Sequence, residues 1–141
     1  MATNHPKAGP NSVPAYQLSG IPYVTGSGLG TQDLSSETRQ INFPYVTRFI
    51  TFSNNTASEE LYVSFTSQGQ TGVPSDTGLK NIFVIPGGTV ANLDVRCKSV
   101  FLRSSAAIQW SMCAGLTTID KDQFPILTGS INGTLGFEGV G

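Results

Sequence analysis

The chain has 141 residues, of which 12% are charged, and its 8 basic and 9 acidic side chains leave a formal net charge of −1. This length fits a single domain, and the charge balance provides no basic field for nucleic acid or for an anionic membrane surface. No stretch approaches the run of about 18 apolar residues that crosses a membrane, and the N-terminal residues lack the apolar segment of a secretory signal. We therefore expect no membrane insertion and a chain that remains inside the cell that makes it.

The density of charge is itself informative, because an average soluble protein has about 25% charged residues. A surface rich in Ser, Thr, Asn, Gln and Gly is common where many neighbouring chains must pack without mutual repulsion. It is also common in extracellular β proteins. Composition alone is therefore compatible with a self-assembling protein and with an extracellular β protein.

Residues 1–36 are predicted to form an extended N-terminal arm. Prolines recur at positions 6, 10, 14 and 22, and such spacing disfavours both helices and sheets. Tyr16, Ile21 and Tyr23 are apolar anchors that a flexible linker would not need, which favours an arm that becomes ordered on a neighbouring subunit. The alternative is a disordered or self-packed terminus. We expect that deletion of residues 1–30 leaves a folded domain but prevents its incorporation into a larger assembly.

The glycine-rich run at residues 26–30 does not predict a nucleotide site. A dinucleotide fingerprint needs a helix directly after the glycines, and residues 31–36 open none. A flexible turn is the better interpretation.

Residues 37–127 are predicted to form the folded domain, and its central element is the nine-residue stretch Tyr45–Ser53. β-branched and aromatic residues dominate this stretch, which is typical of a strand. Val46, Ile50 and Phe52 share one side, whereas Tyr45 and Phe49 share the other. A strand that is apolar on both sides lies centrally in a covered sheet or at a subunit contact.

The remaining pattern consists of short strands and turns. Further strands are predicted at 37–43, 61–65, 81–85, 89–95, 99–103, 107–112 and 116–119, with an edge strand at 124–127 and a glycine-rich C-terminal tail at 128–141. A long polar connection spans residues 67–80. The expected fold is all-β, a single jelly-roll sandwich of about eight antiparallel strands, because one long crossing among short turns favours that path over a meander.

Catalytic chemistry is not predicted anywhere in the chain. The only histidine is His5, which lies in the predicted arm, and no His or Cys cluster has metal-ligand spacing. The segment Asp120–Asp122 lacks the later ligands of a calcium loop, and Glu59 and Glu60 are adjacent on a strand and point apart. We expect no catalytic residues, no metal, no cofactor and no enzyme activity. Cys97 is predicted to point inward and Cys113 outward, so we expect no disulfide between them.

Binding residues are harder to exclude. Trp110 is either an exposed platform for a sugar ring or, since it alternates with Ile108 and Met112, a core residue. Arg39, Arg48, Arg96 and Arg103 all lie within predicted strands. They either form forked hydrogen bonds to partner chains or make ordinary cross-strand pairs. The candidate inter-subunit contacts are therefore Tyr16, Ile21, Tyr23, Arg39, Arg48, Arg96 and Arg103.

Two parts of the core carry a family resemblance. Residues 41–54, and residues 83–89 leading to 93–102, resemble the small single-jelly-roll capsid proteins of large icosahedral double-stranded DNA viruses, especially those that form the penton at five-fold vertices. The resemblance implies a homopentamer in the virion capsid, assembled inside the host cell. It also implies that the N-terminal arm contacts neighbouring major and minor capsid proteins, but it implies no individual site residue. The alternatives are a minor capsid or decoration (cement) protein and a carbohydrate-binding β-sandwich module.

Overall fold

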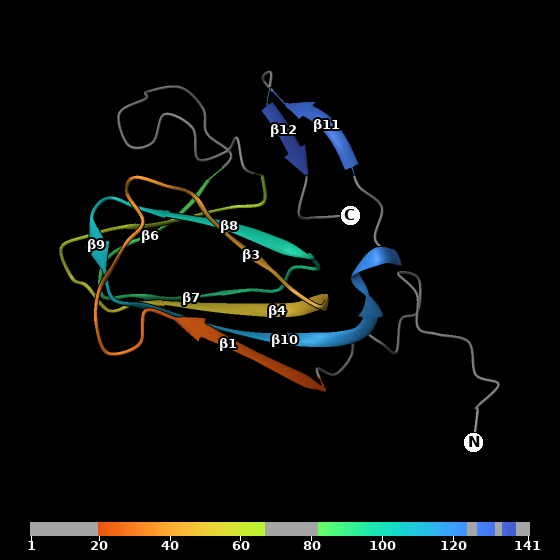
Figure 1. Ribbon diagram of the computed structural model, residues 1–141, viewed down its shortest axis with the longest axis horizontal. Helices are drawn as coiled ribbons and strands as arrows, with labels where there is room; N and C mark the ends of the chain where they lie inside the picture. The colour runs from red at the N-terminus through yellow and green to blue at the C-terminus, as the bar shows by residue number, and fades with distance from the viewer. Residues whose placement is uncertain (1–19, 67–81, 124–126, 132–133, 138–141) are drawn as a thin grey trace.

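The computed structural model describes residues 20–66, 82–123, 127–131 and 134–137, and its regular elements are β-strands apart from one short 3-10 helix (Figure 1). The all-β prediction is confirmed. Within these described ranges, no helix has the length and apolar character needed to span a bilayer.

Eight strands form two antiparallel sheets that face each other (Figure 1). The first sheet has the spatial order β1 (Ile21–Gly26), β10 (Trp110–Asp120), β4 (Tyr45–Asn54) and β7 (Val90–Leu93). The second has the order β3 (Arg39–Asn42), β8 (Ser99–Ser104), β5 (Leu61–Ser64) and β6 (Phe83–Ile85).

Three smaller elements complete the described chain. β2 (Gln32–Asp33) pairs with β9 (Ala107–Ile108), and β11 (Leu127–Ile131) pairs with β12 (Thr134–Phe137). The 3-10 helix η3 (Lys121–Gln123) follows β10.

The pairing of the eight main strands is nested. β1 pairs with β10, β3 with β8, β4 with β7, and β5 with β6, so the first strand pairs with the last and the two middle strands pair with each other. Two further pairings, β4 with β10 and β5 with β8, join these strand pairs into the two sheets. The chain therefore doubles back on itself as one long hairpin, which is rolled into a two-layer sandwich.

The hydrophobic core fills the space between the two sheets. Strand alternation sends Ile50 and Phe52 inward from the first sheet, and Leu61 and Leu102 inward from the second. Burial of each such side chain stabilises the fold by about 1.5–3 kcal/mol.

β4 occupies the central position that the sequence predicted for residues 45–53, between β10 and β7. Its imperfect alternation has a structural cause. Gly115 lies opposite Phe49, but the next residue, Leu116, lies opposite Thr47, so Arg48 is the extra residue of a β-bulge. Beyond this bulge Thr47 faces inward and is buried.

The prediction of an N-terminal arm over residues 1–36 is wrong for its second half. β1 pairs with β10 along its whole length, and the Tyr23 ring packs edge-on against Phe43 with centroids 5.3 Å apart. Leu34 is only 2% exposed. Pro22 is tolerated because β1 is an edge strand, where the missing N–H removes no internal ladder bond. Residues 1–19 of the predicted arm lie outside the described residues.

The C-terminal part of the domain also differs from prediction. Residues 107–112 and 116–119 were expected as separate strands, but β10 runs without a break from Trp110 to Asp120, and Gly115 lies within it rather than at a turn. Leu127 begins the β11–β12 hairpin, so part of the predicted tail at 128–141 is regular structure. The predicted connection at 67–80 and residues 124–126 of the predicted edge strand lie outside the described residues.

Candidate assembly surface

On the outward side of the first sheet, three rows of residues carry no charged side chain, while Arg48 of β4 and Asp120 of β10 lie in the same sheet outside these rows. In register across the four strands, one row is Gly26, Ser111, Ser53 and Val90, the next is Val24, Cys113, Thr51 and Asn92, and the third is Pro22, Gly115 and Phe49. We call these eleven residues the outer face. They alternate along the strands with core residues such as Phe52 and Met112, and Val24 and Val90 are 72% and 62% exposed.

Most side chains of the outer face are small, and none is charged. Two hydroxyl groups of the face already donate hydrogen bonds. Thr51 Oγ1 donates to Asn92 Oδ1 at 2.6 Å, and Ser53 Oγ donates to Asn55 Oδ1 at 2.8 Å. Covering the face would strip no ionised group of its water, which is the costliest step in burying a surface. The outer face therefore has the chemistry of a surface that packs against another chain.

The second sheet presents a different outward side, because its central side chains are already buried within the single chain. Tyr62 and Phe101 point away from the core, yet both are buried. The Tyr62 hydroxyl donates to Glu60 Oε2 at 2.9 Å. Burial first, and then this hydrogen bond and the neighbouring negative charges, raise the pKa of Tyr62 to about 12. Of the two sheets, the first thus offers the more accessible surface.

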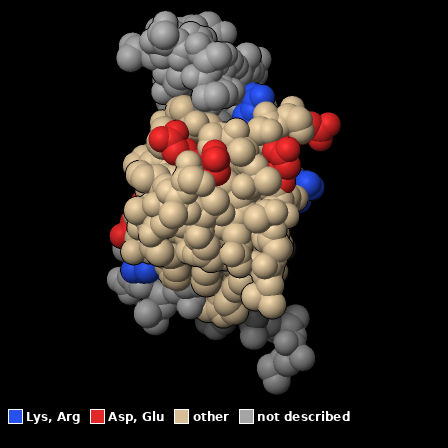
Figure 2. Space-filling model, turned by 90° about the vertical axis from the view of Figure 1, so that its left-hand side faces the viewer, with Lys and Arg blue, Asp and Glu red and all other residues tan. Residues whose placement is uncertain are grey.

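Charged side chains gather elsewhere. Figure 2, which views the molecule from one end of the sandwich, shows them mainly in the upper part, while the centre of this view carries none. One carboxylate in the loop before β5 is that of Glu59, which is half-buried and accepts a hydrogen bond from Ser105 Oγ at 2.6 Å. The charged groups at this end of the sandwich therefore lie toward one side of it.

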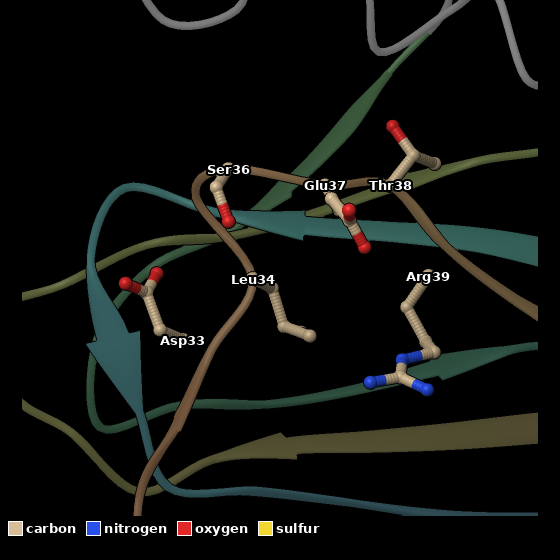
Figure 3. A pocket seen from close by; sticks show the side chains of 6 residues that line it. All are labelled: Asp33, Leu34, Ser36, Glu37, Thr38 and Arg39. Carbon is tan, nitrogen blue, oxygen red and sulfur yellow. The ribbon is translucent and has the colours of Figure 1, made fainter.

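A polar hollow of about 170 Å³ lies at the turn between β2 and β3, lined by Asp33, Leu34, Ser36, Glu37, Thr38 and Arg39 (Figure 3). Asp33 Oδ1 accepts hydrogen bonds from Ser35 N at 2.8 Å and from Ser35 Oγ at 2.6 Å, and both bonds lower the pKa of Asp33. Figure 3 shows the Thr38 side chain pointing away from the other five. Because the Asp33 carboxylate already accepts two hydrogen bonds from Ser35, the hollow has the features of a supported loop.

No metal site is evident in the described part of the chain, where no three His, Cys, Asp or Glu side chains are placed to hold an ion. His5 lies outside the described residues. The two thiols are oriented as predicted and are free: Cys97 is buried and Cys113 is exposed. Burial raises the pKa of Cys97 to about 12, against a smaller opposing effect of its contact with Thr47.

Trp110 is a core residue, and the interpretation as a sugar platform is wrong. Its side chain is 3% exposed, and its Nε1 donates to Gln32 Oε1 at 3.1 Å. An aromatic platform must present its face to solvent, and this ring does not.

Two of the residues predicted to contact a neighbouring subunit, Ile21 and Tyr23, are partly buried within their own chain. Ile21 and Tyr23 pack against the core of their own chain, because the strand that contains them belongs to the first sheet. Tyr16 lies outside the described residues.

The four predicted arginines are divided between different parts of the molecule. Arg103 donates from Nε and Nη2 to Ser35 O at 3.1 and 2.8 Å, so it supports the turn before β3. Arg39 is exposed at the same turn. Arg48 lies at the bulge of β4, and Arg96 is exposed in the segment between β7 and β8. They do not gather on one surface, and the sequence reasoning missed the outer face itself.

Comparisons with models of protein families, with curated proteins and with solved structures find no match. The fold and the outer face therefore carry the functional argument.

Proposed function

We propose that this protein is a structural subunit of an icosahedral viral capsid and that five copies form the penton at each five-fold vertex. The observation that carries the proposal is the nested pairing of eight strands in two four-stranded sheets. Rolling one long hairpin of eight strands in this way is the path of a single jelly roll, an architecture used by capsid proteins, lectins and cupins.

A fold alone does not decide between those uses. The uncharged outer face favours a packing role, since Val24 and Val90 are exposed there and their cross-strand partners, Cys113 and Ser53, carry no charge. A cupin-like enzyme would need a metal or an acid–base pair, and no three His, Cys, Asp or Glu side chains of the described residues are placed to hold an ion.

A ring also suits the edges of the sandwich. β1 and β7 are the outermost strands of the first sheet, and β3 and β6 are those of the second. Unpaired strand edges invite pairing with other chains, and a head-to-tail ring covers them in a closed assembly. In the virion, the neighbouring major and minor capsid proteins would then contact the outside of the ring.

The native mass of the purified full chain tests the proposal. We expect a pentamer when the mass is measured by light scattering during size-exclusion chromatography. A trimer would instead support a decoration protein at a three-fold position, and a chain that stays monomeric at high concentration would contradict the homopentamer. The carbohydrate-binding alternative has lost its supporting observation, because Trp110 is buried.

A further inference from the structure

We propose that the outer face of the first sheet is the docking site for residues 1–19 of a neighbouring copy of this chain. This inference deepens the proposed function and depends on it in one respect, namely that copies of the chain meet in an assembly.

The two edges of the outer face are exposed in the single chain. Val24 and Val90 lie on the two edge strands of the sheet and are 72% and 62% exposed. Between these edge strands lie Cys113, which is exposed, and Thr51, and Asn92 follows on β7 itself. Apolar groups are thus present at both edges, and hydrogen-bonding groups lie between them.

A second copy of the same face is too small a partner. Four strands about 4.8 Å apart and about six residues long cover roughly 300–400 Å². Two such faces packed together would bury about 600–800 Å², below the roughly 1,200 Å² at the lower end of stable interfaces. An extended segment that crosses the face and continues beyond it can bury more surface than the flat contact alone.

Residues 1–19 have the length and the position for this role. They end at Gly20, directly before Ile21, which is the first residue of the edge strand β1. Nineteen extended residues reach up to about 60 Å, whereas the four strands of the sheet span only about 15–20 Å. The segment can therefore leave its own domain at the border of the sheet and cross the face of a neighbour.

The chemistry of the segment matches that of the face. Residues 8–19 carry no charge, and they include the anchors Tyr16 and Leu18. Pro10 and Pro14 lack an N–H donor and favour an extended backbone. Such a segment is poorly suited to adding a strand to a sheet edge, but it can lie on a face and bond its remaining polar groups to hydroxyl and amide side chains such as those of Thr51 and Asn92.

Thiol cross-linking between two differently substituted full chains tests the docking. The first chain carries Gln17→Cys together with Cys113→Ser, which leaves both anchors in place. The second chain is unaltered and presents Cys113, while Cys97 is buried in both. With a short bismaleimide, we expect cross-linked peptides that join position 17 of the first chain to position 113 of the second.

The control partner carries Cys113→Ser and Gln40→Cys. Gln40 is exposed on β3 of the other sheet, so we expect no cross-link to position 17. A cross-link to position 40 in place of 113 would overturn the proposal.

A charge on the face provides a second readout. We expect Val24→Asp in the second chain to lower the yield of the 17–113 cross-link more than about tenfold, because docking would bury an unpaired carboxylate. Leu29→Asp is the matched control, since Leu29 is fully exposed on the loop after β1 and outside the face. Both positions are exposed, so neither change disturbs the core.

The outcomes separate this inference from the proposed function. If the chain assembles but position 17 does not link to Cys113, or Val24→Asp has no effect, the docking is wrong and the capsid role is unaffected. If the chain stays monomeric and no cross-link forms, both are contradicted.

Discussion

The hydroxyl of Thr47 connects β4 to the segment between β7 and β8. It donates to Val95 O at 2.7 Å and accepts from Cys97 N at 3.0 Å, and its side chain is fully buried. We expect Thr47→Val, which keeps the shape but leaves the Cys97 N–H without its partner, to lower the free energy of unfolding by about 1–3 kcal/mol in urea denaturation. The same substitution at Thr51, on the outer face of the same strand, should cost less than about 0.5 kcal/mol. Equal losses at both positions would show that the buried bonds contribute little.

Two buried groups predict a loss of stability at alkaline pH. The pKa of Cys97 and the pKa of Tyr62 are each raised to about 12 in the fold, against unfolded values of about 8.5 and 10. A raised pKa stabilises the fold below the unfolded pKa, and this contribution is lost as pH rises through the folded pKa. The free energy of unfolding should therefore decline from about pH 8.5 to pH 12.

Two substitutions separate these contributions. Cys97→Ala should flatten the decline from about pH 8.5 upward, whereas Tyr62→Phe should flatten it only above about pH 10. Denaturation midpoints measured across this range provide the check. A decline that neither substitution changes would mean that other groups cause it.

The turn between β6 and β7 packs closely against the loop between β4 and β5. A Cβ added at Gly87 would overlap the backbone carbonyl groups of Thr56 and Ala57, which belong to the loop that joins β4 to β5. We expect Gly87→Ala to destabilise the fold by about 1–3 kcal/mol, which would lower the melting temperature by several degrees. Gly30→Ala, where nothing lies within 4 Å of the added carbon, should leave the melting temperature nearly unchanged.

Strands with a regular alternation of apolar and polar residues were predictable, and the exceptions have physical causes. The central position of β4 followed from its β-branched and aromatic residues. β1 was missed because Pro22 and the glycines around it suggest an irregular arm, although an edge strand tolerates a proline. The sequence prediction left residues 113–115 between two strands, whereas here they lie inside one paired strand.

The candidate surface was less predictable than the strands. The outer face depends on which strands are neighbours, and Val24 lies beside Cys113 although about 90 residues separate them in the sequence. No local pattern specifies such a pairing. The orientation of single residues within a strand, as for Cys97 and Cys113, was correct because alternation is a local property.

Truncation of the N-terminus should have two distinct outcomes. Deletion of residues 1–19 leaves all described strands intact, so we expect a folded domain by circular dichroism. Deletion of residues 1–30 removes β1, leaves one edge of β10 unpaired and takes away Tyr23, which packs on Phe43. We expect that shorter chain to unfold or to lose several kcal/mol of stability, which reverses the expectation from the sequence. A stable fold after the longer deletion would show that β1 is dispensable.

The pairing of β1 with β10 also determines the order of events during synthesis. The ribosome completes β1 long before it makes β10, and translation at about 5–20 residues per second leaves the first strand without its partner for roughly 5–20 s. The first sheet cannot close until nearly the whole domain has been made, because β10 lies between β1 and β4. Nascent chains on one messenger therefore hold exposed strand edges, and a factor that shields such edges during translation would raise the yield of folded protein.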